Sequence, residues 1–374
     1  MPPQGGAVVA IRADSGLEIG SGHLMRCLTV AEALRTAGHH AHFLTRDHSG
    51  NLSHVIEARG FGVTRLPIDP SWMGVGVGGY DSWRGGSIVS DVELTARAIA
   101  DFGGCNTLLI DHYGLDKSFE SRMRAFAKKV VVIDDLHNRN HDCDMLIDHN
   151  IGHGPASYDG LVPGHCLRLV GSTYGMLNPA FAEKRPDSLT RRKHGAGPRA
   201  LLVSVGGSDL ADVSSRVLLA RQTASLGLGW IAETHVVLSS AAPNLAKVRD
   251  LCNRTPGAQL HVDTLAMPEL MAVADIAIGG AGVTAMERCT MGLPCLTIVM
   301  AENQASSAVY QEQAGASITV GDPEHATADI LAGHLRSLHS NPDRLREMSS
   351  SAAVLCDGRG LARVGKALFE LIST

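Results

Sequence analysis

Short apolar runs alternate with segments of helical spacing along most of the chain. Residues 8–11 form an apolar run that predicts a buried strand, and the spacing of apolar positions over 24–34 predicts a helix after it. The same alternation continues through the predicted strand 42–45, the helix 89–102 and the strand 107–110. Because strands that alternate with helices are typical of βαβ units, we expect an α/β protein with parallel sheets.

Polar residues follow three successive predicted strands. The strand ends are residues 111–114 (Asp-His-Tyr-Gly), 134–135 (Asp-Asp) and 148–150 (Asp-His-Asn). Open α/β folds place their binding groups at the carboxyl ends of parallel strands, so these ends predict one rim of a cleft. For Asp134 and Asp135, capping of a following helix is as good an interpretation as contact with a ligand.

A glycine-rich loop with Gly20 and Gly22 leads directly to His23. This places His23 at or near the N-terminus of the first predicted helix, where glycines let the backbone approach a ligand closely. A helix N-terminus favours anions and the neutral, proton-accepting form of an imidazole. A buried histidine bonded to a backbone carbonyl is the alternative, but the neighbouring residues favour a catalytic base.

The length of 374 residues predicts two domains, and 44% hydrophobic with 19% charged residues is a globular composition. The charged, proline-containing stretch 178–198 is the best candidate boundary, and its basic run 191–193 is interpreted as a solvated charge patch. We therefore expect domains at 1–180 and 196–345. A C-terminal helix over 346–374 could pack across both.

The second predicted domain carries two glycine loops between a strand and a helix. Residues 206–208 (Gly-Gly-Ser) could cradle a phosphate, although the loop lacks the full dinucleotide fingerprint and a Walker lysine. Glu287, early in the helix after the second loop, could chelate ribose hydroxyls or only interact with the helix dipole. The amides of Asn303 and Gln304 could bind phosphate or base, or stabilise a turn. The candidate nucleotide-binding residues are Gly207, Ser208, Gly280, Gly282, Glu287, Asn303 and Gln304.

Composition excludes several classes of function. The formal charge of -5 disfavours a nucleic-acid partner, and eight scattered cysteines without metal-ligand spacing predict no metal site and a cytoplasmic protein. Residues 1–6 do not resemble a signal peptide, and no apolar stretch is long enough to span a membrane. Residues 71–87, with many glycines and two tryptophans, predict a surface excursion that is either a lid over a ligand or a variable loop.

The motifs together resemble the PseG family. That family comprises UDP-2,4-diacetamido-2,4,6-trideoxy-β-L-altropyranose hydrolases of pseudaminic acid synthesis and is grouped with SpsG-like spore-coat polysaccharide proteins. The matching stretches are 12–15, 19–23, 110–114, 133–135, 141–144, 148–150, 158–163, 205–209 and 302–304. The resemblance implies a GT-B fold similar to MurG, with two Rossmann-like domains facing a central cleft. It also implies that no metal is required and that water replaces UDP at the anomeric carbon with inversion. We further expect a monomer that needs no cofactor.

The resemblance also implies roles for single residues. His23 matches the family's catalytic histidine, Tyr113 its tyrosine near the attacked carbon, and Asp14 its acidic position in the first loop. The other substrate-binding residues expected in the first domain are Gly20, Gly22 and Arg26. The glycine-rich segment 74–86 departs from the family pattern, in a place where sugar specificity could change. A GT-B glycosyltransferase, in which His23 deprotonates an acceptor hydroxyl, and a non-catalytic nucleotide-sugar sensor are the alternatives.

Overall fold

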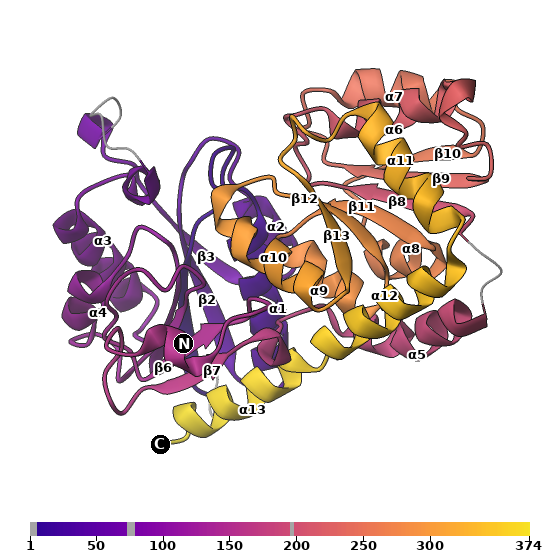
Figure 1. Ribbon diagram of the computed structural model, residues 1–374. Coiled ribbons are helices and arrows are strands. Elements are labelled where there is room, and N and C mark those ends of the chain that lie inside the picture. The colour runs from indigo at the N-terminus through magenta and orange to yellow at the C-terminus, as the bar shows by residue number, and fades with distance from the viewer. Residues whose placement is uncertain (1–5, 73–78, 195–197) are drawn as a thin grey trace. The chain divides into compact units, whose positions relative to one another are not determined.

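The computed structural model describes residues 6–72, 79–194 and 198–374, and it divides into two compact units (Figure 1). Unit 1 runs to Leu177 and also includes Arg359–Thr374, whereas unit 2 is Asn178–Gly358. The predicted excursion and the predicted linker each lie partly outside the described residues, at 73–78 and 195–197. The first five residues of the segment analysed for a signal peptide also lie outside them.

Unit 1 is built on a parallel seven-stranded sheet with the strand order β3-β2-β1-β4-β5-β6-β7. Its strands are β1 (Val8–Ala13), β2 (His40–Arg46), β3 (Gly62–Leu66), β4 (Thr107–Asp111), β5 (Lys129–Ile133), β6 (Met145–Asp148) and β7 (Leu167–Val170). Its helices are α1 (Gly22–Thr36), α2 (Ser53–Ala58), α3 (Ile88–Asp101), α4 (Lys117–Met123) and α13 (Gly360–Ile372), with short 3-10 turns η1 (Pro70–Trp72), η2 (Gly79–Arg84), η3 (Pro155–Tyr158) and η4 (Ser172–Tyr174).

Both faces of this sheet are buried, which is why its strands read as continuous apolar runs rather than alternating ones. In β4, Leu109 packs with α1 and α13 in one core, whereas Leu108 and Ile110 pack with α3 and α4 in the other. The strand order reverses between β1 and β4, and ligands of doubly wound sheets bind at such a reversal. The fold therefore predicts a ligand site at the carboxyl ends of β1 and β4.

Unit 2 repeats the plan with a parallel six-stranded sheet in the order β10-β9-β8-β11-β12-β13, which reverses between β8 and β11. Its strands are β8 (Ala200–Ser204), β9 (Glu233–Leu238), β10 (Ala258–Val262), β11 (Ile276–Gly280), β12 (Cys295–Ile298) and β13 (Ser317–Gly321). Its helices are α5 (Pro179–His194), α6 (Val213–Gln222), α7 (Leu245–Arg254), α8 (Met267–Val273), α9 (Val283–Thr290), α10 (Ala305–Gln313), α11 (Ala328–His339) and α12 (Pro342–Leu355), with 3-10 turns η5 (Ala224–Leu226) and η6 (Glu302–Gln304).

The charged stretch after residue 178 is a helix, α5, and not an irregular linker. The prediction of a solvated patch is wrong for Arg192, which is buried and donates from Nη2 to the carbonyls of Met271 at 2.7 Å and Ala274 at 2.8 Å. These carbonyls lie at the end of α8, where a cation satisfies acceptors that the helix leaves open. Burial lowers the pKa of Arg192 to about 10.

The C-terminal stretch forms two helices that belong to different units. In unit 2, α12 contributes Met348 to the core, and in unit 1, α13 contributes Val364 and Leu368 to the core beside α1. The helix α13 begins where Gly360 meets η4. The last residues of the chain thus complete the first unit.

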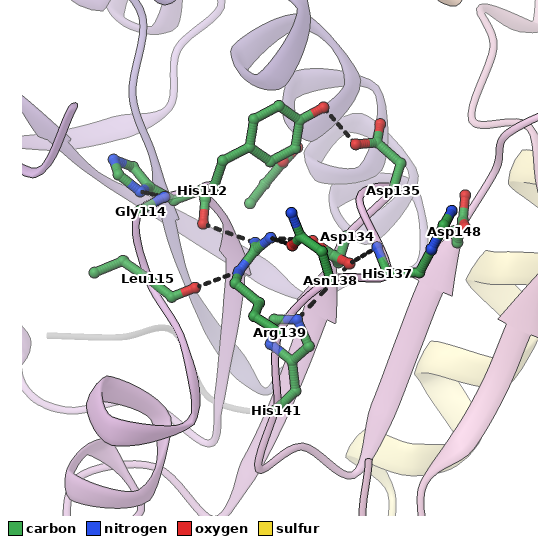
Figure 2. Close-up of polar contacts among 12 residues, drawn as sticks. His112, Gly114, Leu115, Asp134, Asp135, His137, Asn138, Arg139, His141 and Asp148 are labelled. Atoms are coloured by element: carbon green, nitrogen blue, oxygen red, sulfur yellow. Dashed lines mark hydrogen bonds and ion pairs between the residues drawn. The ribbon is translucent and has the colours of Figure 1, made fainter. Parts of the chain in front are cut away.

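No helix follows β5 directly, so Asp134 is not a helix cap. Its Oδ2 accepts hydrogen bonds from the backbone nitrogen of His137 at 3.1 Å and from the Tyr158 hydroxyl at 3.0 Å, and its Oδ1 lies 2.8 Å from Arg139 Nη1. Figure 2 shows Arg139 reaching from this loop to the backbone oxygen of Leu115, at 3.1 Å, in the loop after β4. The buried carboxylate therefore fixes two strand-end loops together.

His141 closes the same loop with a buried positive charge. Its Nδ1 lies 2.7 Å from Glu120 Oε1 and its Nε2 lies 3.8 Å from Asp134 Oδ2. Burial alone lowers the pKa of an imidazole, but these two acidic partners raise the pKa of His141 to about 9. His141 is therefore an imidazolium at neutral pH.

Replacing Gly360 by alanine should destabilise unit 1. A Cβ at this position would lie 2.2 Å from the backbone nitrogen of Gly175, and a backbone atom cannot yield as the end of a flexible side chain can. We expect Gly360→Ala to cost about 1–3 kcal/mol in urea unfolding. The control is Gly333→Ala in α11, where a Cβ meets nothing within 4 Å and alanine should stabilise the helix by up to about 1 kcal/mol. Equal unfolding midpoints for Gly360→Ala and the wild type would contradict this packing.

His141 should make stability depend on pH. Because folding raises the pKa of this imidazole from 6.5 to about 9, its contribution is complete below pH 6.5 and is lost as the pH rises through about 9. The shift corresponds to about 3 kcal/mol. His141→Gln should be less stable at pH 6 and should lack this decline. Urea unfolding between pH 6 and 9.5 tests the expectation, and the same pH slope in both proteins would refute it.

Candidate active site

His23 lies on the first turn of α1 and contacts the carboxylate that ends β4. Its Nδ1 is 2.6 Å from Asp111 Oδ1, and the ring is nearly buried, with 7% of the residue exposed. Among the residues that the structure describes, Nε2 has no hydrogen-bond partner. A carboxylate that holds Nδ1–H leaves the lone pair on Nε2, which is the arrangement of a general base.

Arg26, one turn further along α1, binds the same carboxylate with two nitrogens. Its Nε is 2.5 Å from Asp111 Oδ2 and its Nη2 is 2.6 Å from Asp111 Oδ1. Burial raises the pKa of a carboxyl group, but the charge of Arg26 and the contact with His23 hold the pKa of Asp111 well below its usual range. Asp111 is therefore ionised and can stabilise an imidazolium on His23.

Arg26 also links this pair to the ends of β5 and β6. Its Nη1 is 3.0 Å from Asp135 Oδ2 and 3.1 Å from His149 Nε2. An arginine only donates, so His149 Nε2 is the acceptor and the ring hydrogen is on Nδ1. Burial and the charge of Arg26 lower the pKa of His149 to about 4, so this ring is neutral at pH 7.

Tyr113 packs against the ring of His23, with their centroids 4.4 Å apart and the rings nearly perpendicular. Its hydroxyl donates a hydrogen bond to Asp135. Burial, together with the negative charge of Asp135, raises the pKa of Tyr113 well above its usual value, so the hydroxyl keeps its proton. Tyr113 can therefore shape the site and accept a hydrogen bond at its hydroxyl oxygen, but it is not a base near neutral pH.

The turn η2 brings Trp83 to the same place. Its ring stacks on Tyr113 at a centroid distance of 5.5 Å and meets the ring of His23 edge-on at 5.7 Å. Trp83 is half-buried. The excursion that the sequence predicted thus contributes an aromatic side chain beside His23.

Asp14 has a separate set of partners. Its Oδ1 accepts from Arg12 Nη1 at 2.5 Å and from the backbone nitrogen of Arg46 at 2.7 Å, while its Oδ2 lies 3.1 Å from His112 Nε2. Burial opposes ionisation, but Arg12 and the nearby histidines hold the pKa of Asp14 well below its usual range. These contacts brace the ends of β1 and β2, and among the described residues none joins Asp14 to His23.

Gly20 and Gly22 shape the entry to α1. Gly20 has a φ of +80° and pairs with Gly16 in a short bridge, its backbone nitrogen donating to the Gly16 oxygen at 2.8 Å. Gly22 is the first residue of α1, and a Cβ there would meet nothing within 4 Å. Ser21 caps the helix without a side-chain hydrogen bond, so the first backbone N–H groups remain available to an anion.

In unit 2, Gln304 organises the loop between β11 and α9. Its Oε1 accepts from the backbone nitrogens of Ala281 at 3.1 Å and Met300 at 3.3 Å. Side chains at Gly280 or Gly282 would crowd this amide, since a Cβ would lie 3.4 Å from Oε1 or 3.3 Å from Nε2, respectively. The N-terminus of α9 has no side-chain cap, so its N–H groups can receive an anion.

Glu287 lies on the second turn of α9, with Oε2 enclosed and without a partner among the described residues. Burial raises the pKa of this carboxyl group to about 7. A buried acceptor that lacks a donor is costly, and ribose hydroxyls would supply two donors. Asn303 is exposed at the neighbouring turn η6.

Gly207 and Ser208 follow β8, where the next helix is already capped. Asp209 accepts at Oδ1 from the backbone nitrogen of Val213 and at Oδ2 from that of Ser214, both at 2.9 Å. This carboxylate occupies the N-terminus of α6, the place at which the sequence suggested a phosphate cradle. Ser239 instead fixes the glycine loop, because its backbone nitrogen donates to the Gly207 oxygen at 2.9 Å.

Within 6–72, 79–194 and 198–374, no group of three or more histidine, cysteine and acidic side chains could hold a metal ion. Among the helices in those ranges, none has the length and apolar character to span a bilayer.

The structure brings together His23, Arg26 and Tyr113, which the sequence singled out, but sequence reasoning did not select Asp111 or His149. Both residues lie in the polar strand ends that the sequence analysis identified. Their positions could therefore be predicted from the sequence, but their interaction partners could not. The Arg26–Asp111–His23 arrangement joins two distant stretches of chain, α1 and the end of β4, which spacing alone cannot connect.

Comparison with known proteins finds a matching domain family and related proteins. Residues 201–359 match the glycosyltransferase family 28 C-terminal domain. The spore coat polysaccharide biosynthesis protein SpsG of Bacillus subtilis is 30% identical over 213 residues, which is 56% of this chain and 60% of that protein. The UDP-2,4-diacetamido-2,4,6-trideoxy-β-L-altropyranose hydrolase of Campylobacter jejuni is 22% identical over 208 residues, 56% of this chain and 71% of the relative. The alignment thus spans less than two thirds of SpsG.

Solved structures give the same fold. MurG of Acinetobacter baumannii has a TM-score of 0.68 at 16% identity and covers 98% of this chain and 100% of its own. The calicheamicin glycosyltransferase CalG4 has a TM-score of 0.62 at 14% identity, with 98% of each chain covered. The expected GT-B type of fold, two Rossmann-like units, is confirmed. The chain is thus similar to PseG/SpsG-like proteins and carries a match to the family 28 C-terminal domain.

Proposed function

We propose that the chain is a UDP-sugar hydrolase that cleaves the anomeric C–O bond with His23 as the general base. The observation that carries the proposal is the Asp111–His23 pair, with Nδ1 held at 2.6 Å and Nε2 free of protein partners in the described part of unit 1. The substrate type follows the hydrolase relative, which acts on a UDP-linked 2,4-diacetamido-2,4,6-trideoxyhexose.

In this mechanism water attacks the anomeric carbon from the face opposite UDP. The water proton passes to His23 Nε2 as the new C–O bond forms, and the bond to the UDP oxygen breaks with its electron pair leaving on UDP. Asp111 stabilises the imidazolium that results. The product sugar has the opposite anomeric configuration, and the reaction needs no metal or cofactor.

Arg26 and Tyr113 support this step without taking the proton. Arg26 keeps Asp111 and Asp135 ionised inside the protein, since an unpaired buried carboxylate would be protonated instead. The Tyr113 hydroxyl donates its hydrogen bond to Asp135, so its oxygen can orient the water or a sugar hydroxyl as a hydrogen-bond acceptor. We assign Asp14 a positioning role, because its carboxylate is engaged by Arg12 and His112.

We assign the nucleotide to unit 2. The open N-terminus of α9, at Gly282, offers backbone donors to the diphosphate, and these donors also stabilise the charge that grows on UDP as it leaves. Glu287 offers its unpartnered carboxylate oxygen to the ribose hydroxyls. Gln304 holds the loop between them in place.

The family 28 domain match favours one second candidate, a glycosyltransferase. The same His23–Asp111 pair could deprotonate the hydroxyl of an acceptor instead of water. UDP release from a panel of UDP-sugars without any acceptor separates the two activities, because only a hydrolase turns over under these conditions. A protein that binds the UDP-sugar but releases UDP only when an acceptor is added would be a transferase.

Removing the base should abolish turnover and spare nucleotide binding. We expect His23→Gln to lower kcat by about 10²- to 10⁴-fold, the usual contribution of one general base. Its affinity for UDP, measured by calorimetry, should stay within twofold of the wild type, because the nucleotide is assigned to unit 2. Normal turnover by this variant would remove His23 from the mechanism. In ¹⁸O-labelled water the label should enter the free sugar, whereas label in the phosphate would mean P–O cleavage.

Asp111 should act on the rate through the imidazole. Asp111→Asn keeps a similar shape but can no longer fix Nδ1–H or stabilise the imidazolium, so kcat should fall by about 10²-fold or more, and the pH profile of kcat should change with it. The matched control is Asp159→Asn, since Asp159 forms an exposed ion pair with Arg168. Equal loss of activity in both variants would show a general effect of charge rather than a role for the pair.

A further inference from the structure

Two aromatic side chains, Trp83 and Tyr113, contact the ring of His23, and a third, Tyr80, packs against both of them. The whole chain has only three tryptophans and five tyrosines. Tyr113 lies on the strand-end loop after β4, while Tyr80 and Trp83 come from η2. The ring of Tyr80 is 4.8 Å from that of Tyr113 and 4.9 Å from that of Trp83, both near-perpendicular contacts. We call Tyr80, Trp83 and Tyr113 the aromatic wall.

The turn η2 is docked at this place by specific contacts. A Cβ on Gly114 would lie 2.5 Å from the backbone oxygen of Tyr80, so only glycine lets the turn come this close to the β4 loop. Arg84 is buried and donates from Nη1 to the Gly114 oxygen at 3.0 Å. His48 Nε2 donates to the Trp83 oxygen at 2.8 Å. The turn is thus held from the loop after β2 and from the loop after β4.

The aromatic wall differs from the hydrophobic core because part of its surface remains exposed. Tyr113 is 9% exposed and His23 is 7% exposed, but Tyr80 and Trp83 both remain half-buried. Tyr113 stacks on Trp83 with an angle of 23° between the rings, and His23 and Tyr80 pack against Trp83 in near-perpendicular contacts. An accessible aromatic ring beside a candidate base is a typical contact for the apolar part of a substrate.

We infer that Trp83 is a specificity-determining residue that packs against the C–H surface and methyl groups of the substrate's sugar. This inference rests on the proposed function and names the kind of sugar that the site selects. An indole ring gains from contact with C–H groups and cannot satisfy a hydroxyl that is pressed onto its face. The wall therefore favours a 6-deoxy, N-acetylated hexose over a hexose with a hydroxyl at C6.

The test measures binding and not turnover. Calorimetric titrations use UDP-2,4-diacetamido-2,4,6-trideoxyhexose, UDP-N-acetylglucosamine and UDP, each in the His23→Gln background so that substrate is not consumed. Trp83→Ala and Trp83→Phe are compared with that background. Trp230→Phe is the matched control. Trp230 belongs to unit 2, shortly before β9 begins, and its ring stacks on that of His339 with the centroids 4.2 Å apart.

We expect Trp83→Ala to weaken binding of the deoxy sugar nucleotide by about tenfold and to narrow its preference over UDP-N-acetylglucosamine. Trp83→Phe should retain most of the affinity, and UDP alone should bind all variants within twofold. Unchanged affinities, equal losses for the two UDP-sugars, or an equal loss for UDP would each overturn the inference. If the deoxy sugar nucleotide binds as expected but the wild type releases no UDP, the proposed hydrolase fails while the role of Trp83 stands.

Discussion

The carboxylate of Asp111 is the constraint on which the first unit's site depends. It is fully buried at the end of β4, and a buried charge is tolerated only when hydrogen bonds and opposite charge replace water. Arg26 supplies two of these contacts and His23 a third. Because the two residues stand three positions apart on α1, one helix face meets one carboxylate. The requirement to satisfy Asp111 thereby fixes both the position of the imidazole and the nitrogen that it leaves open.

The two units present different chemical groups at the same kind of sheet reversal. In unit 1 the strand ends beside the β1–β4 reversal carry ionisable side chains, so that edge can hold and move a proton. In unit 2 the loop after β11 is glycine-rich, and its donors are backbone N–H groups at the start of α9. Fixed backbone dipoles suit the permanent negative charge of a diphosphate. A proton acceptor instead needs a side chain with a free lone pair, such as an imidazole.

The sequence predicted the framework well and the partners poorly. Buried strands such as β4 can be predicted from the sequence because both of their faces are apolar. His23 can be identified as a candidate site residue because it lies between a glycine loop and the start of a helix. Arg192 was misjudged, since a basic run looks solvated until the carbonyls at the end of α8 are placed beside it. Periodicity reports which face of an element is buried. It does not report which side chain from another element will arrive there.

Asp14 illustrates how a residue can influence the position of site residues through a neighbouring loop, without a hydrogen bond to His23 among the described residues. His112 and Tyr113 are consecutive, yet His112 Nε2 lies 3.1 Å from Asp14 Oδ2 while Tyr113 bonds to Asp135. His112 Nδ1 accepts from the Gly114 nitrogen at 3.0 Å, so its hydrogen is on Nε2 and points to the carboxylate. The cluster of Arg12, Asp14 and His112 therefore sets the conformation of the loop after β4. Through that loop it fixes where Tyr113 stands against the imidazole and where η2 can dock.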